Sequence, residues 1–409
     1  MIGKKITNIF LILSLAVFLF GSGYKLGEYK TSLSKIELSN FNILNSSKSS
    51  LDFSLFWDTW DKVQQKFIDK KKIDAKKMLY GAIKGMVASL DDPYTFFLSP
   101  EENQQSKDDL SGKFEGIGAQ LGLKDNRIVI IAPLKNSPAE SAGVRAGDFI
   151  NKVDKQSTKN WALTQAVSKI RGPKGTKVSL NLERSGKIFD VVITRQQINV
   201  ASVELSYETK NNNQVAYLKI NQFGDSTNDE WDNAIREIKN KWQAKQIKGM
   251  VLDLRDNPGG YLDSSVYLAS EFLPQGKLIV KQESTNFYQT KNYFSMRSGM
   301  LQDIPLVTLI NKGSASASEI LSGALRDYKR TVLVGEKSFG KGSVQEALDL
   351  KEGAGLHVTV AKWILPNGDW INGKGIEPQI KVENIIKEGN TLTKQDDKQL
   401  EKAIEEVLK

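Results

Sequence analysis

Cysteine is missing from all 409 residues, and the sequence contains one histidine, His357. Without cysteine the chain has no disulfide, no thiol nucleophile and no thiolate ligand for a metal. A zinc site needs three or four ligands, so a single histidine also excludes zinc enzymes built on histidine and cysteine. Any catalytic triad that uses histidine would have to use His357.

Positively and negatively charged residues are nearly balanced. Lys and Arg number 57 against 48 Asp and Glu, and the basic residues are spread along the whole chain. This spread favours a solvated surface near anionic lipid or wall polymer over a nucleic-acid-binding stripe. Hydrophobic residues at 40% and charged residues at 26% exclude collagen, a coiled-coil rod and a multi-span membrane protein. The length allows two or three domains.

A charge-free run from Ile6 to Gly23 follows Lys4 and Lys5. The run is about as long as a bilayer-spanning helix, and basic residues before it place the remainder of the chain outside the cytoplasm. We expect residues 1–30 to form a signal anchor of a single-pass cell-membrane protein. The alternative is a signal peptide cleaved near residues 21–23, which would give a secreted protein. Residues 31–50 are rich in Ser, Asn and Lys and indicate a linker.

The remaining sequence predicts a multidomain protein of the α+β or α/β class. Apolar residues at helical spacing indicate an N-terminal helical region over residues 51–105. Short β-rich pieces with two short helices indicate a small β-barrel-like module over residues 106–196. Strands and helices alternate over residues 197–385, which predicts a largely parallel sheet with helices packed on it. A C-terminal helix is expected within residues 386–409.

Two predicted strand-to-helix turns carry candidate chemistry, residues 253–260 and residues 311–319. In an α/β sheet, sites form where such turns meet. Gly259 and Gly260 offer main-chain N–H groups, and Ser316 lies between two alanines. An exposed serine beside free N–H donors can act as a nucleophile with an oxyanion hole. The alternative is that Ser316 and Glu319 form only a helix capping box, with Ser314 and Ser318 also available.

A serine nucleophile needs a base, and two residues are candidates. His357 lies inside a predicted strand, away from the glycine-rich turns, which makes it a poor base. Lys341 lies between glycines at residues 339–343, so a Ser–Lys arrangement is the alternative, although a single lysine is ordinarily a solvated charge. Residues 335–341 also approach a phosphate-binding loop, but Gly342 stands where Ser or Thr should bind magnesium.

Several motifs occur in a fixed order along residues 55–385. They are Ser89–Thr95 (SLDDPYT), Phe114–Gly118 (FEGIG), Ala142–Asp148 (AGVRAGD), Leu252–Gly260 (LDLRDNPGG), Gly313–Ile320 (GSASASEI) and Phe339–Gln345 (FGKGSVQ). In these motifs the chain resembles the carboxyl-terminal processing proteases, tail-specific Ser–Lys peptidases with an embedded PDZ domain. It departs from the family pattern at Lys155, where glycine is common, and at Gln379, where aspartate is usual.

The resemblance implies a ClpP/crotonase-like protease core over residues 197–385 that needs no metal or cofactor. It assigns Ser316 as nucleophile, Lys341 as general base and Gln345 as the residue that orients the lysine. The oxyanion donors would be the N–H of Ala317 and that of either Gly259 or Gly260. Burial without a counter-charge would lower the lysine pKa from its reference value of about 10.4, as a base requires.

The resemblance also makes residues 106–196 a PDZ domain that binds the C-terminal tail of a protein substrate. PDZ domains add the peptide as an extra strand and capture its carboxylate with backbone N–H groups. The tail-binding residues would be Gly116, Ile117, Gly118, Ala119, Gln120 and Leu121. Arg171 would sense the tail, unless it is an ordinary exposed loop arginine. Substrates would be proteins with free, apolar C-termini, and family habit suggests a homodimer.

Two other functions compete with this interpretation. The first is a non-catalytic, membrane-tethered PDZ adaptor on a protease-like fold. The second is a crotonase-like enzyme that acts on acyl thioesters, which the PDZ module and the export signal disfavour. Cleavage of an unstructured protein by wild type and by Ser316→Ala distinguishes the protease from both.

Overall fold

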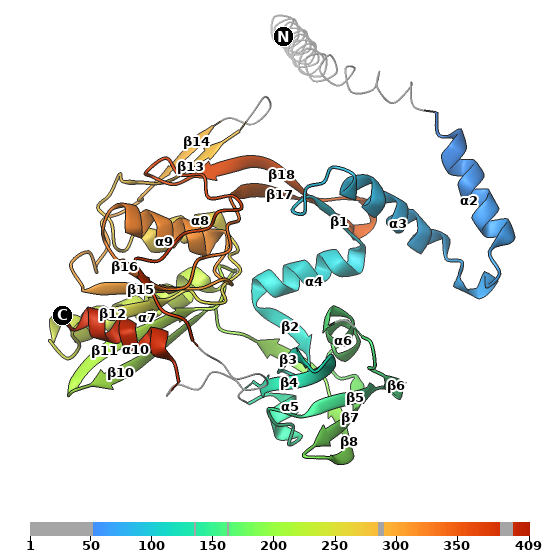
Figure 1. The fold of residues 1–409 in the computed structure, drawn as a ribbon, viewed down its shortest axis with the longest axis horizontal. Coiled ribbons are helices and arrows are strands. Elements are labelled where there is room, and N and C mark those ends of the chain that lie inside the picture. Colours follow the sequence, from blue (N-terminus) through green and yellow to red (C-terminus); the bar gives the residue numbers. More distant parts are fainter. Residues whose placement is uncertain (1–51, 135, 162, 285–289, 385–395) are drawn as a thin grey trace, which may run out of the picture. The chain divides into compact units, whose positions relative to one another are not determined.

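The computed structural model describes residues 52–134, 136–161, 163–284, 290–384 and 396–409 (Figure 1). The predicted signal anchor at residues 1–30 and the linker at residues 31–50 therefore lie outside the described residues. Within the described ranges, no helix has both the length and the apolar character needed to cross a bilayer. The chain divides into two units, with the boundary after Leu79.

The first unit contains helix α2 (Ser54–Lys66), the short helix η1 (Lys70–Lys72) and the start of α3 (Ala75–Ala88). Apolar side chains of α2 stay in contact with solvent. Leu55 is 75% exposed and Trp57 is 57% exposed. The sequence predicted helices here, and the structure has them.

The region predicted as helical also contains a strand. After α3, the chain forms β1 (Phe96–Leu98) and then α4 (Pro100–Ser111). α4 begins with a capping box in which Ser99 N–H donates to Glu102 at 2.8 Å. β1 pairs antiparallel with β18 (Gly355–Ile364), far along the chain. A three-residue strand with such a distant partner leaves no periodicity to detect in the local sequence.

The β-rich module forms a sheet in the order β3-β4-β5-β7-β8, with β6 beside β5 and a separate β2–β9 pair. Its elements are β2 (Lys113–Gly116), β3 (Ala119–Lys124), β4 (Arg127–Pro133), α5 (Pro138–Ser141), β5 (Phe149–Val153), β6 (Gln156–Ser157), α6 (Leu163–Ile170), β7 (Lys177–Arg184), β8 (Lys187–Thr194) and β9 (Gln196–Asn199). The strands and the two short helices expected here are confirmed. Because β3 is an edge strand, its outer main-chain groups are open to an added strand.

The C-terminal half of the chain contains a six-stranded sheet in the order β10-β11-β12-β15-β16-β19. The strands are β10 (Val203–Lys210), β11 (Asn213–Ile220), β12 (Met250–Asp253), β15 (Leu306–Ile310), β16 (Val332–Gly335) and β19 (Ile380–Lys381). All neighbours except β10 and β11 are parallel, as the alternating pattern predicted.

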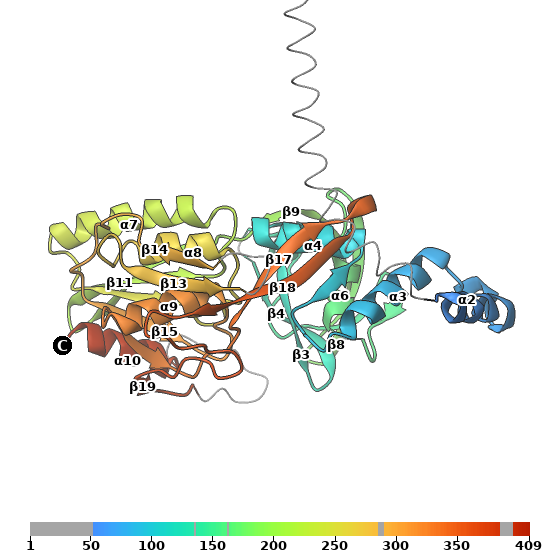
Figure 2. The same cartoon turned by 90° about the horizontal axis from the view of Figure 1, so that it is seen from above.

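Helices cover both faces of this sheet (Figure 2). Three helices pack on one face: α7 (Thr227–Gln243), α8 (Leu262–Ala269) and α9 (Ala317–Asp327). The C-terminal helix α10 (Lys398–Val407) packs on the other face through Leu400, Ala403 and Ile404. Successive strand residues point to opposite faces, so strands covered on both sides consist of continuous apolar runs.

A second sheet has the order β1-β18-β13-β14, with β17 beside β18. Its remaining strands are β13 (Leu278–Glu283), β14 (Lys291–Phe294) and β17 (Ser343–Asp349), and the short helix η2 (Lys351–Gly353) joins β17 to β18. This sheet brings the N-terminal strand β1 and the segment after Lys341 onto one strand, β18.

Candidate active site

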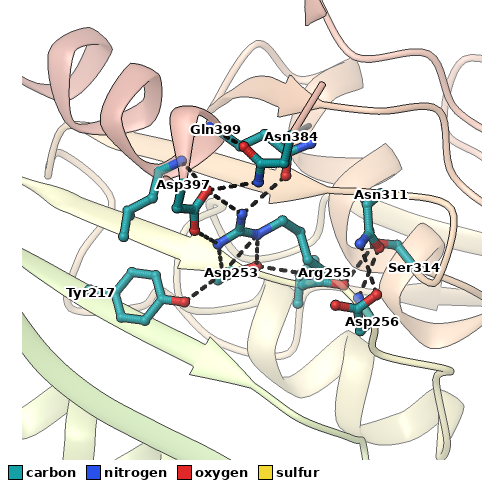
Figure 3. Close-up of polar contacts among 11 residues, drawn as sticks. Tyr217, Asp253, Arg255, Asp256, Asn311, Ser314, Asn384, Asp397 and Gln399 are labelled. Atoms are coloured by element: carbon teal, nitrogen blue, oxygen red, sulfur yellow. Dashed lines mark hydrogen bonds and ion pairs between the residues drawn. The ribbon is translucent and has the colours of Figure 1, made fainter. Parts of the chain in front are cut away.

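The two glycine- and serine-rich turns meet because β12 and β15 are parallel neighbours. Their carboxyl ends therefore share one edge of the sheet, as expected. Ala315 N–H donates to the Asn257 carbonyl oxygen at 3.0 Å, and Asp256 and Asn311 exchange two hydrogen bonds (Figure 3). These bonds fix the turn with the paired glycines against the turn with the serines.

Ser316 has an unusual backbone conformation. It precedes α9 with φ 55° and ψ −116°, a region that costs free energy for any residue with a side chain. Ser316 is partly exposed, whereas Ser314 and Ser318 are fully buried and donate to the carbonyl oxygens of Leu254 and Asn257. Of the three serines in this turn, Ser316 is the one that a substrate can reach.

Glu319 joins the serine turn to the lysine loop. Its carboxylate accepts from Ser316 N–H at 2.9 Å, which is the glutamate half of the expected capping box. It also accepts from Ser338 Oγ, Gly340 N–H and Lys341 N–H at 2.5, 2.7 and 3.0 Å. Burial raises the pKa of Glu319, and these four hydrogen bonds oppose that shift. The sequence predicted the cap but not the contacts with the lysine loop.

Lys341 lies in the environment that a lysine base requires. Burial lowers its pKa from the ordinary value, while the charges of Asp92 and Glu319 raise it in part. Its Nζ atom lies 5.1 Å from the centroid of the Tyr94 ring. Among the described residues no hydrogen bond joins this Nζ atom to Ser316 Oγ. The structure therefore brings the loops of the proposed dyad together without connecting the two reacting atoms.

Gln345 lies at the start of β17 and bonds to two hydroxyl groups. Its amide donates to Ser343 Oγ at 2.8 Å and to Thr359 Oγ1 at 3.1 Å. Neither partner is Lys341, so the orienting role assigned to Gln345 stays a prediction.

The two glycines of the first turn differ in their contacts. Gly259 N–H donates to Asn257 Oδ1 at 2.9 Å, and a Cβ atom at Gly259 would lie 2.8 Å from Ser316 Cβ. Within the described part of the chain, the N–H groups of Gly260 and Ala317 have no hydrogen-bond acceptor. Gly259 thus allows the close approach of the serine turn, and the free donors are those of Gly260 and Ala317.

His357 lies in strand β18, as predicted, and stacks on Phe96 with the ring centroids 4.7 Å apart. Burial lowers its pKa, and the charge of Lys341 lowers it further. The sequence placed His357 away from the glycine turns, but it lies within electrostatic reach of Lys341. A histidine with a lowered pKa is uncharged at neutral pH, so His357 places no second positive charge beside Lys341.

The predicted tail-binding residues form the loop between β2 and β3 and the start of β3 itself. The N–H groups of Ile117 and Gly118 donate to no described residue, while their carbonyl oxygens accept from Ala139 and Leu134. The Ile117 side chain is buried in the module's core. The loop thus offers free N–H donors, and the Ile117 side chain belongs to the core of the module.

Arg171 is not an ordinary exposed loop arginine. Its side chain is 25% exposed, pairs with Asp109 of α4 at 2.8 Å and lies 4.5 Å from the Phe114 ring centroid. Its side chain lies beside Gly116, next to the free N–H donors of the loop. Because α4 begins at Pro100, before the β-rich module, this contact links the loop to a helix that extends beyond the module.

Three known families match the chain. They are "Activating protease CtpB N-terminal domain" over residues 19–102, "PDZ domain" over residues 104–183 and "Peptidase family S41" over residues 214–382. The carboxy-terminal processing protease CtpA of Bacillus subtilis (strain 168) is 39% identical over 350 residues, which are 84% of this chain and 72% of CtpA. The chain belongs to the carboxy-terminal processing protease family.

Other members of the carboxy-terminal processing protease family agree with this assignment. CtpB of the same Bacillus strain is 39% identical over 76% of this chain and 64% of CtpB, so the match spans less than two thirds of that relative. The solved structure of a photosystem II D1 C-terminal processing protease is 30% identical, with a TM-score of 0.52 and coverage of 79% of this chain and 86% of that chain. The family consists of serine peptidases of the S41 type that contain a PDZ domain.

Proposed function

We propose that this protein is a serine endopeptidase that hydrolyses peptide bonds near the C-terminus of extracytoplasmic proteins. One observation carries the proposal. Ser316 is partly exposed and has a strained backbone conformation, and the Glu319 carboxylate accepts hydrogen bonds from both Ser316 N–H and Lys341 N–H. Burial lowers the pKa of this lysine. Strained, partly exposed hydroxyls beside a lysine with a lowered pKa are found at nucleophilic sites.

The reaction begins when neutral Lys341 accepts the Ser316 hydroxyl proton. The alkoxide attacks the scissile carbonyl, and the N–H groups of Ala317 and Gly260 stabilise the oxyanion. Lys341 then donates the proton to the nitrogen of the scissile bond. The tetrahedral intermediate breaks down, the amine product departs, and an acyl-enzyme ester on Ser316 remains. Water, activated by the same lysine, then hydrolyses the ester and regenerates Ser316. The rate should rise with pH because only the unprotonated amine accepts the proton.

The PDZ domain supplies substrate recognition in this proposal. The free N–H groups of Ile117 and Gly118 bind the terminal carboxylate, and the edge strand β3 pairs with the residues before it. A carboxylate bonded to N–H donors makes stronger hydrogen bonds than a neutral amide, so a free C-terminus is preferred.

The deciding experiment measures cleavage of an unfolded protein by the wild type and by Ser316→Ala and Lys341→Ala. Both variants should lose more than about 10³-fold in kcat with an unchanged melting temperature. Ser314→Ala and Ser318→Ala are the matched controls. Ser314→Ala loses two hydrogen bonds, one that Ser314 Oγ donates to the Leu254 carbonyl oxygen and one that it accepts from Asn311 N–H, whereas Ser318→Ala loses one. Each bond is worth about 1 kcal/mol of stability, and both variants should keep substantial activity. If Ser316→Ala cleaves as fast as the wild type, Ser316 is not the nucleophile and serves only as a helix cap. If the wild type itself does not cleave, the protein is a non-catalytic PDZ adaptor.

We further propose that residues 1–30 anchor the chain in the cell membrane, with the domains outside the cytoplasm. Support comes from the apolar run and the lysines before it. Carbonate extraction followed by protease treatment of intact cells tests both points. A secreted protein would appear in the medium with a new N-terminus.

A homodimer and a ClpP/crotonase-like fold of the core stay predictions. The exposed apolar side chains of α2 support the homodimer, because such side chains mark interaction surfaces. Sedimentation of the wild type and of Trp57→Ser tests it, and an unchanged monomer in both would contradict it.

A further inference from the structure

The turn at Asp92–Thr95 faces the Lys341 side chain. Asp92 and Tyr94 are both partly buried, and the Lys341 Nζ atom lies over the Tyr94 ring. A distance of 5.1 Å to the ring centroid is within the range of a cation–π interaction. Asp92 acts on Lys341 through its charge and makes no ion pair with it among the described residues.

Hydrogen bonds hold the Asp92–Thr95 turn in one conformation. The Asp92 carboxylate accepts from Tyr94 N–H at 3.1 Å and from Thr95 Oγ1 at 2.7 Å. Thr95 Oγ1 in turn accepts from Thr359 N–H at 3.0 Å, and Thr359 Oγ1 accepts from Gln345. One chain of hydrogen bonds therefore connects the turn to the glutamine assigned to orient the lysine. These contacts form because β1 and β17 both pair with β18.

Four titratable groups act on Lys341 from three elements. Asp92 and Tyr94 belong to the turn, Glu319 to α9 and His357 to β18. His357 is held neutral, and the Glu319 carboxylate already accepts four hydrogen bonds. Asp92 and Glu319 both favour the ammonium through their charges, and the Tyr94 ring adds a cation–π contact. The Asp92–Thr95 turn therefore supplies two of the three groups that stabilise an ammonium at this position.

We propose that the Asp92–Thr95 turn is a positioning element for the base: it holds the protonated Lys341 side chain over the Tyr94 ring and away from Ser316, and releases the neutral amine. A ring face and a carboxylate attract an ammonium, but they have little attraction for an amine. Loss of the proton therefore frees the side chain to reach Ser316 Oγ. The inference rests on the proposed role of Lys341 as the base.

The test compares the pH dependence of kcat/KM in the full-length protein. Asp92→Asn is nearly isosteric, removes the charge and keeps one oxygen that can accept from Tyr94 N–H. Tyr94→Leu removes the ring. Both should move the rising limb of the profile to lower pH. At a pH below the wild-type midpoint, their rates relative to their own plateaus should increase several-fold.

The controls change the same turn without removing the charge or the ring that faces Lys341. Asp91→Asn alters the adjacent carboxylate at φ 53°, a conformation that asparagine accepts readily. Tyr94→Phe keeps the ring. Both profiles should overlay the wild-type profile. A purely structural turn would lower the plateau in Asp92→Asn and Tyr94→Leu and leave the limb in place, which would overturn the inference.

A second readout does not depend on activity. In Ser316→Ala protein labelled with ¹³C-lysine, the Lys341 Cε signal is assigned by its loss in the Lys341→Ala double variant. Its titration should move to lower pH in Asp92→Asn and Tyr94→Leu, and an unmoved titration overturns the inference. Absence of Ser316-dependent cleavage in the wild type would instead contradict the proposed function, and the titration would still decide the role of the turn.

Discussion

At the scale of single residues, Gly259 shows how closely the two turns approach. Its φ is +102°, and an added Cβ would lie 2.8 Å from Ser316 Cβ and 3.1 Å from Ala317 N. Gly259→Ala should therefore displace the nucleophile and the oxyanion donor and lower kcat by about 10²–10³-fold. Gly186→Ala is the matched control, because it carries a positive φ of +79° in open space. It should lose stability but keep full activity.

The residues that the structure brings together at the candidate site were predictable from the sequence, but their contacts were not, and their catalytic roles stay predictions. The serine, the lysine and the paired glycines are recognisable from motif order. The conformation of Ser316, the second role of Glu319 and the contact of Tyr94 with Lys341 are not. Each depends on residues that are distant in sequence and meet only through strand pairing. Glu319 illustrates the limit, since a Ser-x-x-Glu spacing predicts a cap whether or not the carboxylate has other partners.

At the scale of elements, one buried network of ion pairs connects the C-terminal helix α10 to the end of strand β12. Arg255 donates to Asp253 at the end of β12 and, at 2.8 and 2.9 Å, to both carboxylate oxygens of Asp397 (Figure 3). Gln399 accepts a further bond from Arg255 at 3.0 Å. Arg255 lies in the same turn as the paired glycines, so the helix stabilises the turn that carries Gly260, the proposed oxyanion donor.

Asp397→Asn should weaken this connection between α10 and β12. Asparagine still caps α10, but Arg255 loses one of its two buried carboxylates, so unfolding free energy should fall by about 3 kcal/mol in urea titrations. Burial opposes ionisation of Asp397, but the hydrogen bond and charge of Arg255 outweigh it and lower the pKa. The stabilisation is therefore present above the unfolded carboxyl pKa and is lost as pH falls through the folded value.

The stability difference between wild type and Asp397→Asn should accordingly shrink at acid pH. Glu401→Gln, an exposed change on the same helix, is the control and should leave the urea midpoint almost unchanged. An equal loss in both variants would show that the helix, and not the ion pair, accounts for the effect.

Elements with strong periodicity were predictable, and those that depend on distant partners were not. The alternating strands of the PDZ domain and the β12–α8 and β15–α9 units follow the sequence pattern closely. β1 was missed because three residues inside a helical region carry no signal of their own. Its pairing with β18 nevertheless brings the Asp92–Thr95 turn to Lys341.

At the scale of the whole molecule, the proposed function requires the PDZ domain and the protease core to act on one substrate chain. Arg171 lies beside the loop with the free N–H groups and pairs with Asp109 of α4, a helix that begins before the β-rich module. α4 also contacts the core, since Asn103 donates to Asp349 at 3.0 Å. A tail bound at the loop can therefore affect the core through Arg171 and α4.

Cleavage should depend on a free C-terminus and on Arg171. One peptide is offered as the free acid, as the amide and with a terminal lysine, and kcat/KM should be highest for the acid with an apolar end.

Arg171→Ala should lower kcat more than it weakens binding of the tail, measured with Ser316→Ala protein by fluorescence anisotropy. Arg127→Ala, which removes a partly exposed ion pair with Glu183 inside the PDZ domain, is the control. Equal rates for the three peptides would contradict tail recognition, while a loss of binding equal to the loss of kcat would confine Arg171 to the binding step.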